Sequence, residues 1–324
     1  MNELEHALTS SVVKALLGEG LQASWHGAQQ AQPPIDGKLD VRWSGGGHTF
    51  PAVVKHGLVP AAVGMLPVVD DGVVVTNYVS SKLRHALTDA GWGFVDACGN
   101  ASLTAPGLII RLEGGRPQKD VAPPIAAPFS RTGLPVTFVL LVRGRTGTQR
   151  ELAATAKSSL GTTNRVLQGL RMLGYLSEDA EVRRPAALRD RWTEAFLVHR
   201  DALATPQRFT SDRWKRPHDV LQAKLPHGAY LGSEVAAAAR GLSIRPETGL
   251  IYCSSPVRNE VIVQGRLRAD PVGWLEIRST FWSKNLLGVE SQVVPDLLIR
   301  ADLLSEADPR LTALARELAR GVDS

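Results

Sequence analysis

The stretch TQRELAATAKSSLGTTNRVLQGLRMLGYLSE, residues 148–178, has the pattern of two short amphipathic helices joined by a turn. Thr148 is followed three residues later by Glu151, the spacing of a capping box at a helix start. Ser-Leu-Gly at 159–161 marks the turn, and Gly174 ends the second helix. The pattern predicts a helix pair that either binds DNA or only fills a core.

The second helix of this pair has an apolar side and a polar side. Its apolar stripe consists of Leu160, Val166, Leu167, Leu170 and Leu173. We expect this stripe to pack on a buried helix predicted from GLPVTFVLLVRG, residues 133–144. The opposite side and the residues before it carry hydroxyl, amide and guanidinium groups, which can reach base edges or phosphates. These candidate DNA-contacting residues are Ser158, Ser159, Thr162, Thr163, Asn164, Arg165, Gln168 and Arg171.

A short basic hairpin is predicted after the helix pair. YLSEDAEVRR, residues 175–184, follows Gly174 and ends in Arg183 and Arg184. A winged helix-turn-helix places such a hairpin beside the DNA groove, and Arg150 in the first helix of the pair adds another cation. The pattern therefore favours a winged helix-turn-helix DNA-binding domain, with a purely structural three-helix unit as the alternative.

The positive charge of the chain is concentrated around this stretch. The net charge is +5, and residues 116–186 hold eleven Lys and Arg against five Asp and Glu. Residues 1–115 hold seven Lys and Arg against ten Asp and Glu. Residues 187–324 hold nineteen Lys and Arg against seventeen Asp and Glu. Clustered positive charge is what a polyanion-binding element needs, because each neutralised phosphate releases condensed counterions.

Composition divides the 324 residues into three parts. The Pro- and Ala-rich segment RPQKDVAPPIAAP, residues 116–128, is predicted to be a linker. The fold class expected is α/β and α+β, multi-domain. Residues 1–115 form an α/β domain, 129–186 the winged helix-turn-helix, and 187–324 an α+β domain for dimerisation or partner contact.

The first part has the element order of a known nuclease fold. A helix, a hairpin formed by LDVRW and TFPAVVKH, a strand, a second helix and further short strands resemble the restriction-endonuclease-like fold of PD-(D/E)xK nucleases. Asp40 and Lys55 stand at its degenerate catalytic positions, but Val53 replaces the acid, and nothing in the spacing supports Asp36 or Asp96. One carboxylate is a poor Mg²⁺ cage, so we expect no metal, no cofactor and no catalysis. A Mg²⁺-dependent nuclease is the alternative.

The third part mixes helices and strands. Helices are expected in RDRWTEAFLVHRDAL, SEVAAAARG and DPRLTALARELARG; strands are expected in LIYCSS, NEVIVQGRL and GWLEIRST, and a strand-to-helix segment in VVPDLLIRADLL. RFTSDRWKRPHD, residues 208–219, offers a second possible DNA patch at Arg213, Lys215 and Arg216, with Trp214 available for stacking. A solvated turn explains that segment equally well.

Several stretches together resemble the AbiEi-like family, the transcriptional regulators and antitoxins of type IV toxin–antitoxin systems. They are VVVTNYVSSKLRHALTDAGWGFVDACGNASLTAPGLIIRLEG, SLGTTNRVLQGLRMLGYL and VVPDLLIRADLLSEADPRLTALARELA. The resemblance implies a non-enzymatic autorepressor that binds double-stranded promoter repeats, with Ser159–Leu173 as recognition helix and residues 177–184 as wing. It also implies a functional link to a nucleotidyltransferase-like toxin. A homodimer, or a DNA-binding protein of a mobile element acting with a protein partner, stays open.

Two further features concern the compartment. The longest apolar run, LPVTFVLLV, is far shorter than the ~20 residues that span a bilayer, and the start of the chain lacks the features of a signal peptide. The two cysteines have neither disulfide nor zinc spacing. We therefore expect a cytoplasmic protein with no membrane contact.

Overall fold

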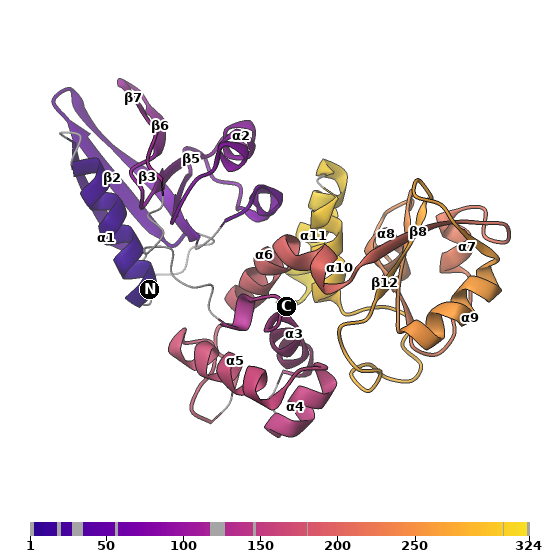
Figure 1. Cartoon of the computed structure of the whole chain (residues 1–324). Coiled ribbons are helices and arrows are strands. Elements are labelled where there is room, and N and C mark those ends of the chain that lie inside the picture. The colour runs from indigo at the N-terminus through magenta and orange to yellow at the C-terminus, as the bar shows by residue number, and fades with distance from the viewer. Residues whose placement is uncertain are drawn as a thin grey trace. The chain divides into compact units, whose positions relative to one another are not determined.

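The computed structural model describes residues 3–17, 21–27, 35–55, 58–116, 127–144, 147–179, 181–306 and 308–322. The chain divides into two compact units, Met1–Pro124 and Ile125–Ser324 (Figure 1). Most of the predicted linker, residues 117–126, lies outside the described residues.

The first unit is built on a mixed sheet. Its elements are α1 (Glu3–Leu17), β1 (Gln22–Gly27), β2 (Gly37–Trp43), β3 (Gly46–Lys55), η1 (Pro60–Met65), β4 (Val73–Thr76), α2 (Ser81–Asp89), β5 (Gly93–Asp96), β6 (Ala101–Ala105) and β7 (Leu108–Leu112). In the described residues seven strands follow one another across the sheet in chain order. Strands β3, β4 and β5 run parallel, and the other neighbours are antiparallel.

Helices cover both faces of this sheet. Leu8 and Val12 of α1 pack against the inward side chains of the strands, among them Val73 and Val75 of β4. Val74 is also buried and points to the other face, where α2 contacts η1 and β5. Because β4 is buried on both faces, it reads as a continuous apolar run rather than an alternating one.

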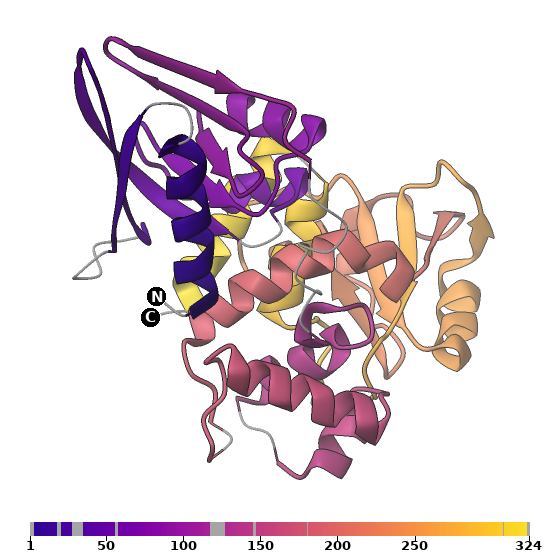
Figure 2. The same cartoon turned by 60° about the vertical axis from the view of Figure 1, so that its left-hand side comes forward.

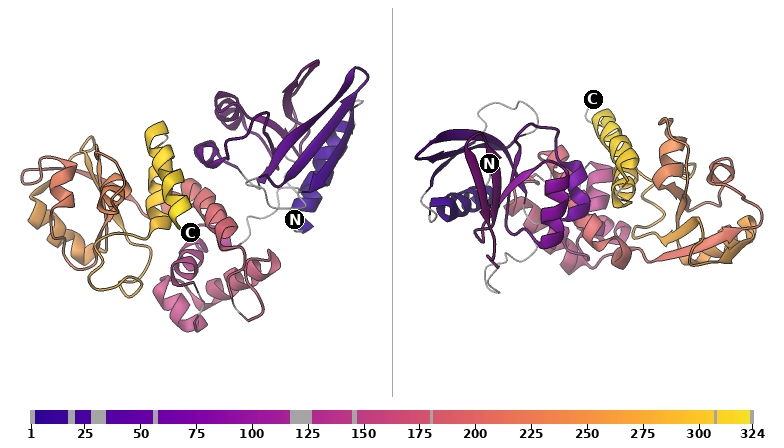
Figure 3. Two further views of the ribbon diagram at one scale, coloured as in Figure 1. Left: turned by 180° about the vertical axis from the view of Figure 1, so that it is seen from behind. Right: turned by 90° about the horizontal axis from the view of Figure 1, so that it is seen from above.

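The second unit joins a helical part to a smaller mixed sheet (Figure 2). Its elements are η2 (Ala127–Phe129), α3 (Leu134–Arg143), α4 (Gln149–Thr155), α5 (Leu160–Met172), α6 (Pro185–Leu203), β8 (Pro206–Ser211), α7 (Pro217–Leu221), β9 (Ala229–Gly232), α8 (Ser233–Ala239), β10 (Gly249–Cys253), α9 (Ser255–Gly265), β11 (Leu267–Ala269), β12 (Leu275–Ser279), α10 (Asp296–Ser305) and α11 (Pro309–Val322). The strand order across the described sheet is β11-β8-β12-β10-β9, with β10 and β12 parallel. Helix α11 packs along α10 (Figure 3).

One aromatic core holds the helical part and the sheet together. Trp192 of α6 stacks on Phe138 of α3 at 5.2 Å and on Phe196 at 4.9 Å, between ring centroids. Phe281 and Trp282, which follow β12, contact Phe138 from the sheet side. This shared core explains why residues from Ile125 to the C-terminus cluster as one unit.

The mixed α/β class predicted from the sequence is confirmed, but some elements differ. NEVIVQGRL was expected to be a strand, whereas α9 covers most of it. Pro256 in the first turn suits a helix start, and Val257 and Val261 fall one helical turn apart, with Val261 buried. This spacing overrides the strand preference of the valines and isoleucine. Strands β1, β8 and β9 were not predicted.

Candidate nucleic-acid interface

Helices α4 and α5 form the predicted pair. The Thr148 side chain accepts a hydrogen bond from the Glu151 N–H, and the Glu151 carboxylate accepts one from the Thr148 N–H, so the predicted capping box is confirmed. Ser159 caps α5 by accepting from the Thr162 N–H. Gly174 ends this helix in the left-handed region, at φ +70°.

The turn between the two helices is anchored to the sheet part of the unit. The Lys157 ammonium donates to the Thr280 carbonyl at 2.9 Å, and the Ser283 N–H donates to the Thr155 carbonyl at 2.7 Å. Burial lowers the pKa of Lys157. The Lys157 side chain is therefore directed toward the segment after β12, and its ammonium stabilises the position of the turn.

One side of α5 is locked into the core. Val166, Leu167 and Leu170 are buried, as the apolar stripe predicts. A side chain at Gly169 would meet Pro128 at 2.7 Å, so η2 packs directly on the helix backbone. Leu160 was expected in this stripe, but half of its side chain is exposed, at 50%. The first turn of α5 extends beyond the part of the helix that buries its apolar side chains.

The opposite side of α5 presents polar groups to solvent. Asn164, Arg165 and Gln168 are exposed, and Thr162 and Arg171 are half-buried. Thr163 is fully buried, so its hydroxyl does not belong to this surface. The hydroxyls of Ser159 and Thr162 bond to each other at 3.0 Å as part of the helix cap. The amides and Arg165 are therefore the groups on this surface best able to contact a ligand.

A short hairpin follows α5 directly. The Tyr175 N–H donates to the Leu170 carbonyl at 2.8 Å, and an antiparallel bridge joins Leu176 to Val182. Arg183 and Arg184 are exposed at its end, as predicted. The Arg184 guanidinium lies over the Tyr175 ring at 5.0 Å. Arg183 approaches the exposed Glu181 at 3.8 Å, a surface pair worth little.

A shallow groove opens between the starts of α4 and α5. It is lined by Thr148, Gln149, Arg150, Leu160, Gly161 and Asn164. Ser158, at the edge of the turn, is half-buried, and Arg150 is exposed. Most of the sequence-predicted contact residues thus lie on α5, on its cap or at the hairpin end, and Arg150 lies at the start of α4.

The degenerate nuclease positions of the first unit do not come together. Asp40 lies opposite Thr49 in the β2–β3 pair, whereas Lys55 is six residues further along β3, about 20 Å away in an extended strand. Asp36 lies nearer to Lys55, but its carboxylate accepts a hydrogen bond from the Val54 N–H at 2.7 Å. This bond fixes the chain just before β2 against β3. The structure therefore provides no catalytic pair from Asp40 and Lys55.

Asp96 has a structural role in the same unit. Its buried carboxylate accepts from the N–H groups of Val79, Cys98 and Asn100, and from the Asn100 amide. These bonds order the loop after β4 and the turn between β5 and β6. In the described parts of the chain, no three His, Cys, Asp or Glu side chains form a group able to hold a metal ion.

Comparison with known proteins found a family similar to the C-terminal part. Residues 181–321 match the model of a family described as transcriptional regulator, AbiEi antitoxin, type IV TA system. This part of the chain is therefore similar to the AbiEi antitoxin family. No curated protein and no solved structure matched the chain in the same comparisons. Residues 181–321 form the AbiEi region. It begins at the second arm of the hairpin and includes Arg183 and Arg184.

The second possible DNA patch lies within the AbiEi region, around β8 and α7. Arg213, Lys215 and Arg216 are exposed. The Arg213 guanidinium donates to the Gln264 carbonyl at 3.1 Å, and Arg216 approaches the Asp219 carboxylate. Trp214 is only 4% exposed, so its ring is not available to stack on a base. Its ring packs against Gly265 instead.

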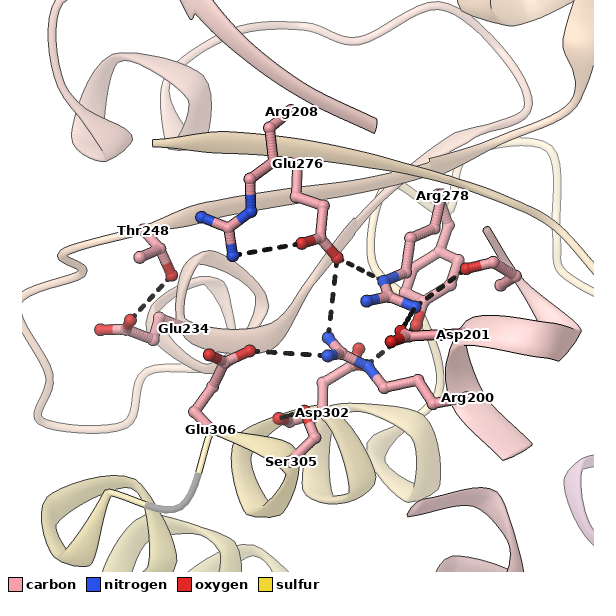
Figure 4. Close-up of polar contacts among 12 residues, drawn as sticks. Arg200, Asp201, Arg208, Glu234, Thr248, Glu276, Arg278, Asp302, Ser305 and Glu306 are labelled. Carbon is pink, nitrogen blue, oxygen red and sulfur yellow. Dashed lines mark hydrogen bonds and ion pairs between the residues drawn. The ribbon is translucent and has the colours of Figure 1, made fainter. Parts of the chain in front are cut away.

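The AbiEi region also contains a buried charge network that the sequence did not reveal (Figure 4). Asp302 of α10 accepts from the Arg200 guanidinium at 3.3 Å and from the Tyr252 hydroxyl at 2.9 Å. Arg200 also approaches Glu276 of β12 and Glu306 at the end of α10. The network ties α6, β10, β12 and α10 together.

The same network extends along β12. The buried Arg278 guanidinium contacts Glu276, and it binds the Asp201 carboxylate and the Ala204 carbonyl at 2.8 and 2.9 Å. Three guanidinium groups, counting Arg208 on Glu276, therefore meet the carboxylates of four acids. The paired charges all belong to the second unit. The network therefore stabilises the packing of α6 and α10 on the sheet.

Asp302→Asn is expected to reduce the pH dependence of stability. Burial raises the pKa of Asp302 from 3.8 to about 6, although Arg200 and the Tyr252 hydroxyl oppose the shift. Because the pKa is higher in the folded state, the protonated form of Asp302 stabilises the fold. This contribution is complete below pH 3.8 and is lost as the pH rises through about 6. Relative to the variant, the native protein should lose about 2 kcal/mol of unfolding free energy between pH 4 and 7. Urea unfolding of both proteins at several pH values measures this difference. If their unfolding free energies change with pH in the same way, the prediction is wrong.

In the described residues, no helix is long and apolar enough to cross a membrane.

Proposed function

We propose that this chain is a sequence-specific double-stranded DNA-binding repressor of the antitoxin type. In this proposal α3, α4, α5 and the hairpin form a winged helix-turn-helix, with α5 as recognition helix. The observation that carries the proposal is the surface of α5. Asn164, Arg165 and Gln168 face solvent beside a basic hairpin, while the other side of the helix is fixed in the core.

The chemistry of this surface suits DNA. Asn and Gln can form two hydrogen bonds to adenine, and Arg can form two to guanine, in a major groove wide enough for a helix. Within the described residues, neither Arg150 nor Arg165 forms an ion pair with an acid, so both charges are available to a polyanion. The excess of eleven Lys and Arg over five Asp and Glu in residues 116–186 supports the same reading.

The remaining parts take supporting roles in this proposal. The first unit is a nuclease-like scaffold without activity, since Asp40 and Lys55 lie far apart and Val53 is no acid. The AbiEi region, whose family is described as a regulator and antitoxin, provides dimerisation or partner contact. The chain then acts without a cofactor, represses its own promoter in the cytoplasm and is functionally linked to a nucleotidyltransferase-like toxin.

Arg183→Ala is expected to weaken binding to all DNA sequences alike. Arg183 stands at the hairpin end, where a guanidinium contacts phosphates rather than bases. Losing one phosphate contact should lower the slope of log affinity against log salt by about one unit. Titrations of specific and random DNA at several salt concentrations measure the slope. A loss confined to the specific site would instead make Arg183 a base contact.

A promoter fusion tests the proposed function in cells. The chain should repress a reporter transcribed from the DNA upstream of its own gene, and the double variant Asn164→Ala, Gln168→Ala should relieve the repression at equal protein level. Because both side chains are exposed, the double variant keeps the fold. Equal reporter output with and without the chain would contradict autorepression.

A further inference from the structure

Leu160 exposes an apolar side chain at the start of α5. It is the first residue of α5, directly after the Ser159 cap, and it is 50% exposed. Its helical position aligns it with the buried Leu167, two turns further on, yet the core does not cover it. The exposed Leu160 side chain, among polar neighbours, is placed to contact an apolar group of a ligand.

The surroundings of Leu160 are polar and open. Leu160 lines the groove together with Gln149, Arg150 and Asn164. Asn164 lies four residues after Leu160, so the two side chains are neighbours on the helix surface. A Cβ added at Gly161 would meet no atom within 4 Å, so the backbone between them is open to close approach.

Resting on the proposed function, we infer that Leu160 and Asn164 together read an A·T-containing step in the major groove. Leu160 contacts the 5-methyl group of a thymine, and the Asn164 amide bonds the N6 and N7 atoms of an adenine. Gln149 and Arg150 stand on the other side of the groove, where they can reach the flanking backbone. The operator therefore contains a thymine whose methyl group adds to the affinity.

The size of the apolar spot favours this ligand over a protein partner. A stable protein interface buries on the order of 1,000 Å² or more and has an apolar centre. Here a single leucine is set among amide and guanidinium groups. A thymine methyl group is a matching apolar spot beside hydrogen-bonding base edges.

Operators carrying deoxyuridine test the inference, because deoxyuridine lacks only the 5-methyl group of thymidine. Each thymine of the bound site is replaced in turn, and the affinity of the native chain is measured. One position, or one symmetric pair, should weaken binding about fourfold, the effect of one lost methyl contact. Leu160→Ala should bind the unmodified operator about as weakly and should be insensitive to deoxyuridine at that position.

A matched control lies on the same helix. Met172 is 88% exposed at the far end of α5, so Met172→Ala should keep the affinity and the deoxyuridine effect of the native chain. If the native chain binds its operator but tolerates deoxyuridine everywhere, the inference is wrong and the proposed function stands. If Leu160→Ala keeps the deoxyuridine effect, another side chain reads the methyl group. Failure of the native chain to prefer any operator overturns the proposed function itself.

Discussion

Replacing Trp192 with alanine is expected to cost the second unit about 3–5 kcal/mol of unfolding free energy. The indole is fully buried and stacks between Phe138 and Phe196. Its N–H donates to the Leu134 carbonyl at 3.0 Å, and Trp192→Ala removes this buried hydrogen bond. Because α3 supports α5, we expect the loss to reach the proposed DNA-contacting surface as well.

Amide hydrogen exchange of α3 and α6 in urea measures this loss within the second unit. Trp192→Phe is the matched control, since it keeps a stacked ring and loses the hydrogen bond and part of the volume. It should cost about 1–2 kcal/mol, clearly less than alanine. Similar protection in the native chain and in Trp192→Ala would show that this core does not hold the unit together.

Arg165→Ala is expected to weaken operator binding by about 1–3 kcal/mol, or roughly 5- to 150-fold, through the loss of a two-bond contact to a base. Arg165 is exposed, and its guanidinium only approaches the Gly161 carbonyl, at 3.4 Å. The substitution should therefore leave the fold unchanged. Its effect should fall on one base pair, so operators altered at that pair should bind the native chain and the variant alike.

Arg245→Ala is the control for the loss of one positive charge. Arg245 is an exposed residue of the AbiEi region, between α8 and β10. Its removal should change operator affinity little at physiological salt, where charges beyond about 8 Å are largely screened. Titrations of both variants against the same operator make the comparison. Unchanged affinity of Arg165→Ala would remove this arginine from the site.

Local signals explain why the helix pair could be predicted. The capping box of Thr148 and Glu151, the serine cap of α5 and the stop at Gly174 all depend on residues within a few positions of one another. The basic hairpin followed from the same kind of signal. The exposure of Leu160 could not be foreseen, because it depends on where the core supporting α5 ends.

Long-range packing explains what the sequence concealed. β8 carries exposed polar residues and reads as a loop, but Arg208 pairs with Glu276 of the neighbouring strand. In the charge network, Arg200 and Asp302 are about a hundred positions apart in the chain. Asp40 and Lys55 stand on neighbouring strands of one hairpin, but the register of β2 and β3, which the sequence does not show, separates them.

The most direct measurement is binding of the purified chain to the DNA upstream of its own gene, compared with random DNA of equal length over a salt series. The proposed repressor should bind one site saturably and about 10³-fold or more tighter than random DNA. Equal binding of both DNAs, with a steep salt dependence, would contradict sequence-specific recognition by α5 and reduce the interface to a general contact with phosphates.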